Sequence, residues 1–432
     1  MRILILGAYG FIGSEISRSV VKAGHDVTGL GRDIGYGRRI LPDIDWIKAD
    51  LKNFSSAADW AEIVSGFEVV INASGILQSG PSDDVGQTQN TAIRSCADAC
   101  VSAKVHQLIQ ISAVGSTENA QSDFMQSKAS ADQYVLATDM NSVVLRPGLV
   151  IGRNSYGGSE FLRGTASLPW VTPKLFPDTT IQCVAMSDLV DAVSISIADP
   201  ENFRGSYDLV EEQGQNLASI IDAHRNWLGA PKSKIQIAVP IFIVALLSRC
   251  ADMLSWLGWR SPLRSNAISA LRGGVNGDAA STKTLLGRAP LSLDEALLQY
   301  PAGKQDRLHA GLTFISPILL LSLFLMWTGS GIIGFLEASK AATLLTNAGM
   351  TETAARTAVY SGSVIDIVLG LALLIRPFAR FSILGMIAMT GSYLIGASII
   401  TPHLWLDPLA PLLKTLPAVG LCLACLGLTD KR

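Results

Sequence analysis

The chain has 432 residues, a length that predicts two or three structural units rather than one. Its formal net charge is −2 at pH 7 and its pI is about 6.2, which excludes a general electrostatic attraction to nucleic acid. Charged residues make up only 16% of the sequence, and the mean hydropathy of +0.35 is high for a soluble enzyme. The apolar excess lies in the last third of the chain, where we expect a membrane-embedded part.

The six cysteines show no spacing typical of a disulfide framework. Cys96 and Cys100 share one face of an expected helix, and Cys422 and Cys425 lie in an apolar run, where we interpret them as small packing residues. No cluster of residues predicts a metal site. Because Met1 leads directly into an apolar strand, no signal peptide is expected.

The first 32 residues follow the order strand, glycine turn, helix, strand. The apolar run 3–6 predicts a buried parallel strand, a helical pattern follows up to Gly24, and residues 26–30 predict a second strand. A glycine triplet is weak evidence alone, but between a strand and a helix it indicates a phosphate-binding turn.

The turn reads Gly7-Ala8-Tyr9-Gly10-Phe11-Ile12-Gly13. Its first glycine permits a tight turn, its second lets the backbone approach a pyrophosphate, and its third lets the helix pack closely on the strand. The phosphates would lie at the N–H groups of the helix that begins near Phe11. The alternative is a glycine-rich turn without a ligand.

The spacing G-x-x-G-x-x-G resembles the extended and atypical branches of the short-chain dehydrogenase/reductase superfamily, which include epimerase/dehydratase-like proteins. Further similar segments extend the resemblance over about residues 1–230: 72–75, Ser112, Lys128, 146–152 and 188–190. It implies an α/β Rossmann fold with a doubly wound parallel sheet at 1–150 and a substrate lobe with linker at 151–300. The cofactor-binding residues that follow from it are Gly7, Tyr9, Gly10, Phe11, Ile12, Gly13, Arg32, Asp50, Leu51, Asn72, Ala73, Ser74, Gly75, Lys128 and Pro147.

The end of the second strand bears on the choice of cofactor. In dinucleotide folds an acidic residue there binds the ribose hydroxyl of NAD, whereas an arginine accommodates the 2′-phosphate of NADP. Gly31 occupies the acidic position and Arg32 follows, so NADP(H) is favoured over NAD(H), although the adjacent Asp33 weakens the case. Asp50, after the third strand, is either a residue at the adenine edge or a turn and N-cap residue.

The resemblance implies catalytic roles for Ser112 and Lys128, but one position departs from the pattern. The Tyr-x-x-x-Lys pair of the family reads Phe124 to Lys128 here. The tyrosine normally acts as acid and base, and phenylalanine has no proton to exchange. Two interpretations stay open: an NAD(P)-dependent oxidoreductase or epimerase/dehydratase-like enzyme, and a nucleotide-binding structural or sensory subunit of a membrane complex without turnover.

After Arg307 the sequence contains four nearly uncharged stretches, at 312–333, 359–375, 381–400 and about 408–426. Each approaches the roughly 20 residues that span a bilayer. The order of features resembles the DoxX-like four-helix membrane domain, here at 308–432, which occurs fused to atypical short-chain dehydrogenases in bacteria. This implies a bacterial inner-membrane protein whose partners are the lipid bilayer and an apolar or membrane-associated substrate, such as a quinone or a lipid intermediate. In the second interpretation the partner is a membrane protein.

Charges beside the stretches predict the orientation. Basic residues cluster on one predicted side, and by the positive-inside rule the Rossmann domain and both termini are then cytoplasmic. These residues are Lys304, Arg307, Arg376, Arg380, Lys431 and Arg432. On the opposite side Glu337 and Glu352 partly offset Lys340 and Arg356.

Inside the stretches, Asp366 is the one deeply placed acidic residue. It is either functional or a protonated helix–helix hydrogen-bond donor. The candidate partners are His309, Lys340, Arg356 and His403, and close helix packing is expected at Gly329, Gly331, Gly334 and Gly370.

The stretch 235–247 is apolar but short for a membrane span. With Trp256, Trp259 and Arg260 after it, it is interpreted either as substrate-lobe helices that touch the bilayer or as an ordinary soluble helix pair.

Overall fold

The computed structural model describes residues 1–429 except 77, 78, 81, 82, 121, 260, 262 and 409. Arg260, Lys431 and Arg432, named in the sequence predictions, therefore lie outside the described residues. The chain forms two compact units. The α/β unit comprises Met1–Asp252 and Ser261–Gly311, and the helical unit comprises Met253–Arg260 and Leu312–Arg432.

The α/β unit is built on a seven-stranded, entirely parallel sheet with the strand order β11-β6-β5-β4-β1-β2-β3. Its strands are β1 (Arg2–Leu6), β2 (Asp26–Gly31), β3 (Asp45–Lys48), β4 (Val69–Asn72), β5 (Gln107–Ile111), β6 (Asn141–Pro147) and β11 (Gly205–Leu209). The order reverses between β1 and β4, which is the doubly wound arrangement, and the predicted Rossmann fold class is confirmed.

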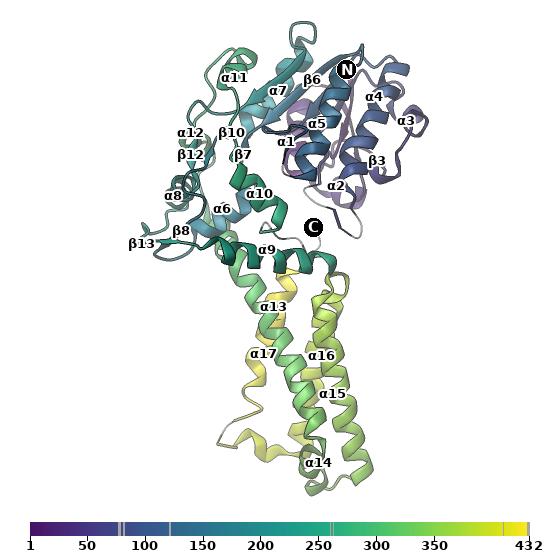
Figure 1. Ribbon diagram of the computed structural model, residues 1–432. Helices are drawn as coiled ribbons and strands as arrows, with labels where there is room; N and C mark the ends of the chain where they lie inside the picture. The colour runs from purple at the N-terminus through teal and green to yellow at the C-terminus, as the bar shows by residue number, and fades with distance from the viewer. Residues whose placement is uncertain are drawn as a thin grey trace. The chain divides into compact units, whose positions relative to one another are not determined.

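The sheet is buried on both faces, as the continuous apolar run of β1 predicts. Ile3 and Ile5 point into one core and Leu4 and Leu6 into the other, because successive strand residues face opposite sides. One core is closed by α1 (Phe11–Lys22) and α7 (Met186–Ala198). The other is closed by α3 (Ala57–Val64), α4 (Ala92–Ser102) and α5 (Asp123–Leu136) (Figure 1).

Smaller elements complete the α/β unit. Between the β-strands lie α2 (Ile34–Ile40), η1 (Leu51–Asn53) and η2 (Gln87–Thr91), a π-helical turn that leads into α4. Three two-stranded pairs follow: β7 (Leu149–Ile151) with β10 (Cys183–Ala185), β9 (Thr180–Ile181) with β12 (Gln215–Asn216), and β8 (Val171–Lys174) with β13 (Ile235–Ala238). The remaining helices are α6 (Gly158–Ala166), α8 (Leu217–Trp227), α9 (Ile241–Trp256), α10 (Ser265–Gly273), α11 (Ala279–Leu286) and α12 (Leu293–Leu298).

The stretch 235–247, interpreted from its sequence as part of a helix, is divided in two. Residues Ile235–Ala238 form β13, and helix α9 starts only at Ile241. Pro240 lies between them, and a proline cannot donate the backbone hydrogen bond that a helix interior needs.

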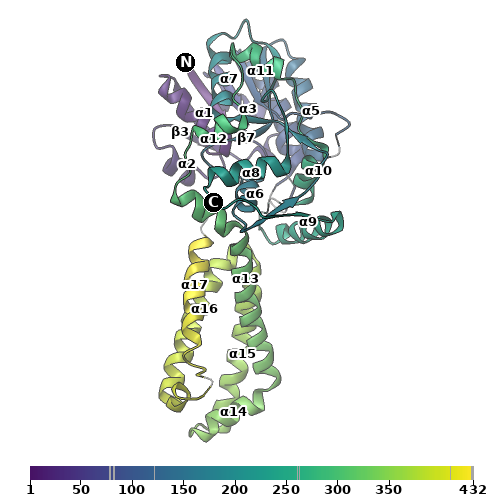
Figure 2. The same cartoon turned by 90° about the vertical axis from the view of Figure 1, so that its left-hand side faces the viewer.

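The helical unit contains α13 (Lys304–Leu336, whose first residues belong to the α/β unit), α14 (Ala338–Asn347), α15 (Glu352–Leu374), α16 (Arg376–Ile400), η3 (Pro402–Trp405) and α17 (Thr415–Leu428). Figures 1 and 2 show α13, α15, α16 and α17 running along one another, and residues of all four share one apolar core. Within the described part of the chain, α13, α15 and α16 are long and apolar enough to cross a membrane.

The fourth predicted span, 408–426, is helical only from Thr415 onward. Helix α17 has 14 residues, so it is ~21 Å long, against ~30 Å for the hydrocarbon core of a bilayer. Pro408 and Pro411 lack the N–H groups that would extend this helix toward its N-terminus.

Close helix packing explains three of the four predicted glycines. A Cβ atom on Gly331 would lie 2.6 Å from the carbonyl oxygen of Ser363, and one on Gly334 would lie 2.7 Å from its hydroxyl. Gly370 packs against Thr328, whereas a Cβ on Gly329 would meet open space. Helices α13 and α15 therefore approach each other along a stripe of small residues.

Asp366 on α15 accepts a hydrogen bond of 2.9 Å from the hydroxyl of Tyr393 on α16. The four predicted partners are wrong. Lys340 and Arg356 instead pair with Glu337 and Glu352 on their own segments, near the ends of the helices rather than at the depth of Asp366.

This packing predicts different effects of alanine at two neighbouring glycines. Gly331→Ala should lower the melting temperature of the full-length protein in detergent, because overpacking a tight contact costs ~1–3 kcal/mol. Gly329→Ala, its control, should leave the melting temperature unchanged or raise it. Equal melting temperatures for the two variants would contradict the close approach of α13 and α15.

Candidate nucleotide-binding site

The turns that follow the parallel strands meet at one edge of the sheet. The hydrogen-bond ladder continues past the strand ends, with Ala73 N–H to Leu6 O at 3.0 Å and Ser112 N–H to Leu145 O at 2.7 Å. In open α/β sheets the crevice at this edge, where the strand order reverses, is where ligands bind.

The glycine turn has the geometry that a diphosphate requires. Gly7 adopts a φ of +73°, and a Cβ on it would lie 2.8 Å from Ser74 Cα. A Cβ on Gly13 would collide with the carbonyl of Gly7. The first hydrogen bond of helix α1 runs from Ser14 N–H to Gly10 O at 3.0 Å, so the N–H groups of Phe11, Ile12 and Gly13 precede it. These residues fit a nucleotide pyrophosphate at the helix N-terminus.

The side chain of Asn72 holds the turn after β4 in place through buried hydrogen bonds and does not project from the edge of the sheet. Buried Asn72 donates to Gln110 Oε1 at 2.7 Å and accepts from the backbone N–H of Ser74 at 3.0 Å and from its hydroxyl at 2.5 Å. Ala73, Ser74 and Gly75 follow, and a Cβ on Gly75 would meet open space. Backbone atoms of these residues therefore face the edge of the sheet.

Tyr9 covers the end of β2, a role that the sequence analysis did not predict. A Cβ on Gly31 would run into the Tyr9 ring, so a larger residue there would have to displace that ring. The Tyr9 hydroxyl accepts hydrogen bonds from the backbone N–H groups of Arg32 (3.1 Å) and Asp33 (3.3 Å), and its ring centroid lies 5.8 Å from that of Trp46. Two features of the sequence could have predicted this contact: an aromatic residue inside the glycine turn and a glycine at the end of the second strand.

Arg32 lies at the end of β2, as predicted, and it already has a partner. Its Nη1 is 2.5 Å from Asp83 Oδ1, and the Arg32 and Asp83 side chains are 40% and 20% exposed. The carboxylate of Asp33 is used elsewhere, since it caps α2 by accepting the N–H of Tyr36 at 2.9 Å.

The other predicted contacts lie around this edge. Asp50 accepts the N–H of Lys52 at 3.3 Å and caps η1, in agreement with the N-cap interpretation, while its role at the adenine edge stays a prediction. Leu51 is buried in the core beside α3 and α4. Pro147 ends β6, where its carbonyl accepts the N–H of Val114 at 3.1 Å.

Ser112 and Lys128, the predicted catalytic residues, lie in one buried cluster with Asp132. The Ser112 hydroxyl donates to Asp132 Oδ2 at 2.6 Å, and Lys128 Nζ donates to Ile111 O at 2.9 Å. All three polar side chains are buried. The Phe124 ring, one helical turn before Lys128, has its centroid 5.6 Å from the lysine Nζ.

Burial controls the protonation of this cluster. It lowers the pKa of Lys128 to about 8, against the opposing charge of Asp132. Burial also raises the pKa of Asp132. The hydrogen bond from Ser112 and the charges of Lys128 and Arg146 act in the opposite direction and lower it. Arg146 Nε lies 3.4 Å from Asp132 Oδ2. The sequence analysis missed Asp132, although its place four residues after Lys128 puts both on one helix face.

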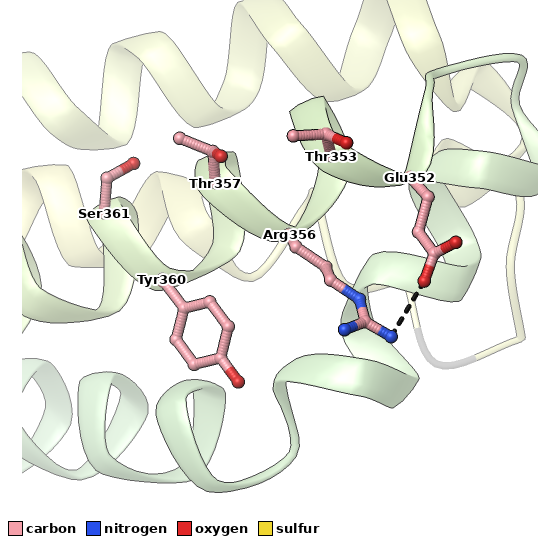
Figure 3. Close-up of a pocket in the computed structure, with 6 residues that line it drawn as sticks. All are labelled: Glu352, Thr353, Arg356, Thr357, Tyr360 and Ser361. Carbon is pink, nitrogen blue, oxygen red and sulfur yellow. Dashed lines mark ion pairs between the residues drawn. The ribbon is translucent and has the colours of Figure 1, made fainter.

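A hollow of a different kind lies on helix α15 of the helical unit (Figure 3). It is lined by Glu352, Thr353, Arg356, Thr357, Tyr360 and Ser361. Figure 3 shows Arg356 and Tyr360 on one side of the helix and the two threonines and the serine on the other. It shares no residue with the predicted site, and its one charged pair, Arg356 with Glu352 at 2.8 Å, is satisfied within the helix.

Comparison with known proteins agrees with this arrangement. Residues 7–164 match the family model of NAD(P)H-binding proteins, and residues 324–423 match that of the DoxX-like family. The chain therefore joins an NAD(P)H-binding domain of Rossmann fold to a C-terminal DoxX-like domain.

Individual relatives are distant. Photosystem II assembly factor Ycf39 of Cyanophora paradoxa is 23% identical over 277 residues, which cover 60% of this chain and 78% of that protein. The structure of Bordetella bronchiseptica WbmG in complex with NAD and UDP has a TM-score of 0.53 at 17% identity, covering 72% of this chain and 96% of that one. A variant of UDP-glucuronic acid 4-epimerase from Bacillus cereus has a TM-score of 0.50 at 18% identity, with coverages of 69% and 96%. These structures show a shared fold with epimerase-like proteins.

The lowered pKa of Lys128 predicts a pH dependence of nucleotide affinity. A protonated lysine attracts the negatively charged nucleotide, so the affinity should be constant below the pKa of about 8 and should fall as the pH rises through it. Titration of NADPH onto the full-length protein from pH 6.5 to 9.5 measures this. Lys128→Met should bind more weakly at pH 7 and show a flat profile. A wild-type affinity that does not change with pH would contradict a contact between Lys128 and the nucleotide.

Proposed function

We propose that the protein is a membrane-attached oxidoreductase that binds NADP(H) at the carboxyl edge of its sheet and acts on an apolar acceptor from the bilayer, such as a quinone or a lipid intermediate. The glycine turn carries this proposal, because Gly7 and Gly13 sit where any side chain would collide with neighbouring backbone. The DoxX-like domain supports an acceptor that resides in or beside the membrane.

The chain's own residues have distinct tasks in this proposal. The N–H groups at the start of α1 bind the pyrophosphate, and Lys128 holds the nicotinamide ribose. The backbones of Asn72–Gly75 and Pro147 line the nicotinamide side. The bound cofactor supplies the hydride.

The position of the family's tyrosine proton donor carries a phenylalanine, and this limits the substrate. Phe124 takes the place of the tyrosine, and the Ser112 hydroxyl is hydrogen-bonded to Asp132. An acceptor that needs no proton from the enzyme avoids this difficulty. A quinone is such an acceptor. Hydride transfer converts it to the hydroquinone anion, which water then protonates.

A second candidate function is nucleotide-dependent assembly of a membrane complex without turnover. The same replacement by Phe124 favours it, and so does the distant similarity to a protein named as a photosystem II assembly factor. The two functions differ in one measurable property, which is whether bound NADPH is oxidised.

The preference for NADP(H) rests on Gly31 and Arg32. The carboxylate of Asp33, which would favour NAD(H), is engaged in capping α2. When a 2′-phosphate binds, the Arg32 side chain leaves Asp83 and pairs with the phosphate. The backbone N–H groups of Arg32 and Asp33 then donate to the phosphate instead of to the Tyr9 hydroxyl.

For location, we propose the bacterial inner membrane with the α/β unit and both termini on the cytoplasmic side. Lys304 and Arg307 lie near the start of α13, and Arg376 and Arg380 near the start of α16. In the proposed topology both helix starts face the cytoplasm. The basic residues of the opposite side are neutralised locally, with Lys340 2.6 Å from Glu337 and Arg356 2.8 Å from Glu352. This distribution follows the positive-inside rule.

The ion pair at Arg32 predicts opposite effects of two substitutions on NADPH affinity. Arg32→Ala removes a charged hydrogen bond worth ~1.5–3 kcal/mol and should weaken NADPH binding by about tenfold to a hundredfold. Asp83→Asn removes a competing carboxylate and should strengthen it. NADH affinity should change little in either variant. Equal affinities of the unmutated protein for NADPH and NADH would overturn the proposed preference.

The proposed reaction is tested by mixing NADPH-loaded protein in nanodiscs with a short-chain ubiquinone and, separately, with a simple ketone. We expect NADPH absorbance at 340 nm to decay with the quinone and to stay nearly constant with the ketone, since general acid catalysis is worth ~10²–10⁴-fold. Phe124→Tyr should raise ketone reduction, and Phe124→Leu is its matched control. A tightly bound NADPH that no acceptor oxidises would favour the assembly function instead.

A further inference from the structure

Helix α9 shows the reverse of the burial expected for a helix on a soluble protein. Its buried positions, Val244, Ser248, Ala251 and Ser255, are small and half of them are polar. Its large apolar side chains are exposed, including Phe242 at 68%, Leu246 at 61% and Met253 at 72%. A helix of a water-soluble domain normally buries its large apolar residues and exposes its polar ones.

The exposed apolar residues form one continuous face. At 100° per residue, the buried positions occupy one narrow stripe, and the apolar residues lie on the opposite side of the helix. We call this the α9 apolar face; it consists of Phe242, Ile243, Leu246, Leu247, Cys250, Met253 and Leu254. The charged residues of α9, Arg249 and Asp252, lie together at one edge of that face, beside Ala245.

The strand before α9 extends the exposed apolar surface. Ile235 and Ile237 point to the same side of β13 and are 55% and 47% exposed. Lys232 and Lys234, which directly precede this strand, are also exposed. Exposed apolar residues flanked by lysines are the composition of a surface that binds anionic lipid headgroups.

The end of α9 identifies the occupant of its apolar face. The residues that follow the helix belong to the helical unit. There, Trp259 Nε1 donates to Leu374 O at 2.6 Å, and Arg376 N–H donates to Leu257 O at 2.9 Å. Leu374 ends α15 and Arg376 begins α16, both helices of membrane length. The C-terminal end of α9 is thus tied to the point where two membrane helices turn back, which is the level of a bilayer surface.

We propose that α9 lies in the interface of the bilayer with its apolar face toward the acyl chains, so that the chain has a membrane contact besides the DoxX-like helices. Trp256, 75% exposed at the end of the helix, is a residue typical of that interface. This proposal is independent of the proposed reaction, since it concerns where the chain meets lipid.

A natural reporter lies in the middle of the α9 apolar face. All six cysteines are within the described residues, and Cys250 is exposed while the other five are buried. The full-length protein is labelled at Cys250 with a bimane maleimide in detergent and returned to nanodiscs of phosphatidylcholine and phosphatidylglycerol. Cys250→Ser gives the background labelling. The matched control is Ala245→Cys in the Cys250→Ser background, which places the label on the charged edge of the same helix.

The proposal predicts that nitroxide-labelled lipid quenches the label at Cys250 severalfold more than the label at position 245, and that iodide in the buffer does the opposite. Strong quenching of the Cys250 label by iodide would place the α9 apolar face in water and overturn the proposal. Quenching by neither agent would mean that protein, such as a second copy of the chain, covers the face, and would overturn it equally.

Discussion

The close approach of two turns governs the nucleotide edge of this protein. Because Gly7 has no side chain, the turn after β1 rests directly on the turn after β4, with backbone atoms in contact across the point where the strand order reverses. Gly13 extends the same constraint to helix α1, whose first N–H groups then point along the edge of the sheet. The geometry of the proposed pyrophosphate site thus depends on the absence of two methyl groups, because a side chain at either glycine would collide with neighbouring backbone.

The second determinant of the site is a buried set of charges. Lys128 and Asp132 share one helix face, and Arg146 reaches the same carboxylate from β6. Burial disfavours the charged forms of Lys128 and Asp132, and the attraction between these two charges offsets part of that cost. Ser112 joins this network by donating its hydroxyl hydrogen to Asp132. The Phe124 ring lies beside the Lys128 end of the same network.

Much of this organisation could be predicted from the sequence, because strongly periodic segments and glycine spacing are local signals. The seven-residue glycine turn, the strand ends that carry Asn72 and Ser112, and the three long apolar helices are of this kind. Contacts between distant segments were not predictable. The pairing of Arg32 with Asp83 and of Asp366 with Tyr393 depends on how loops and helices meet in space, and no local pattern encodes that. Apolar composition alone predicted continuous helices at 235–247 and 408–426. Prolines near 240 and before α17 limit where those helices begin.

The short length of α17 has a consequence for the membrane domain as a whole. A 14-residue helix that packs along α13 and α16 cannot by itself carry the chain across the hydrocarbon layer. A fourth crossing would then need described residues between η3 and α17, which lie outside any regular helix, to reach below the headgroups. Such backbone persists at that depth only where protein covers it or water reaches it. Its local turns, such as Ala410 N–H to Asp407 O at 2.8 Å, satisfy part of that demand. A fourth crossing by this chain would therefore place irregular backbone, rather than helix, within the hydrocarbon layer before α17.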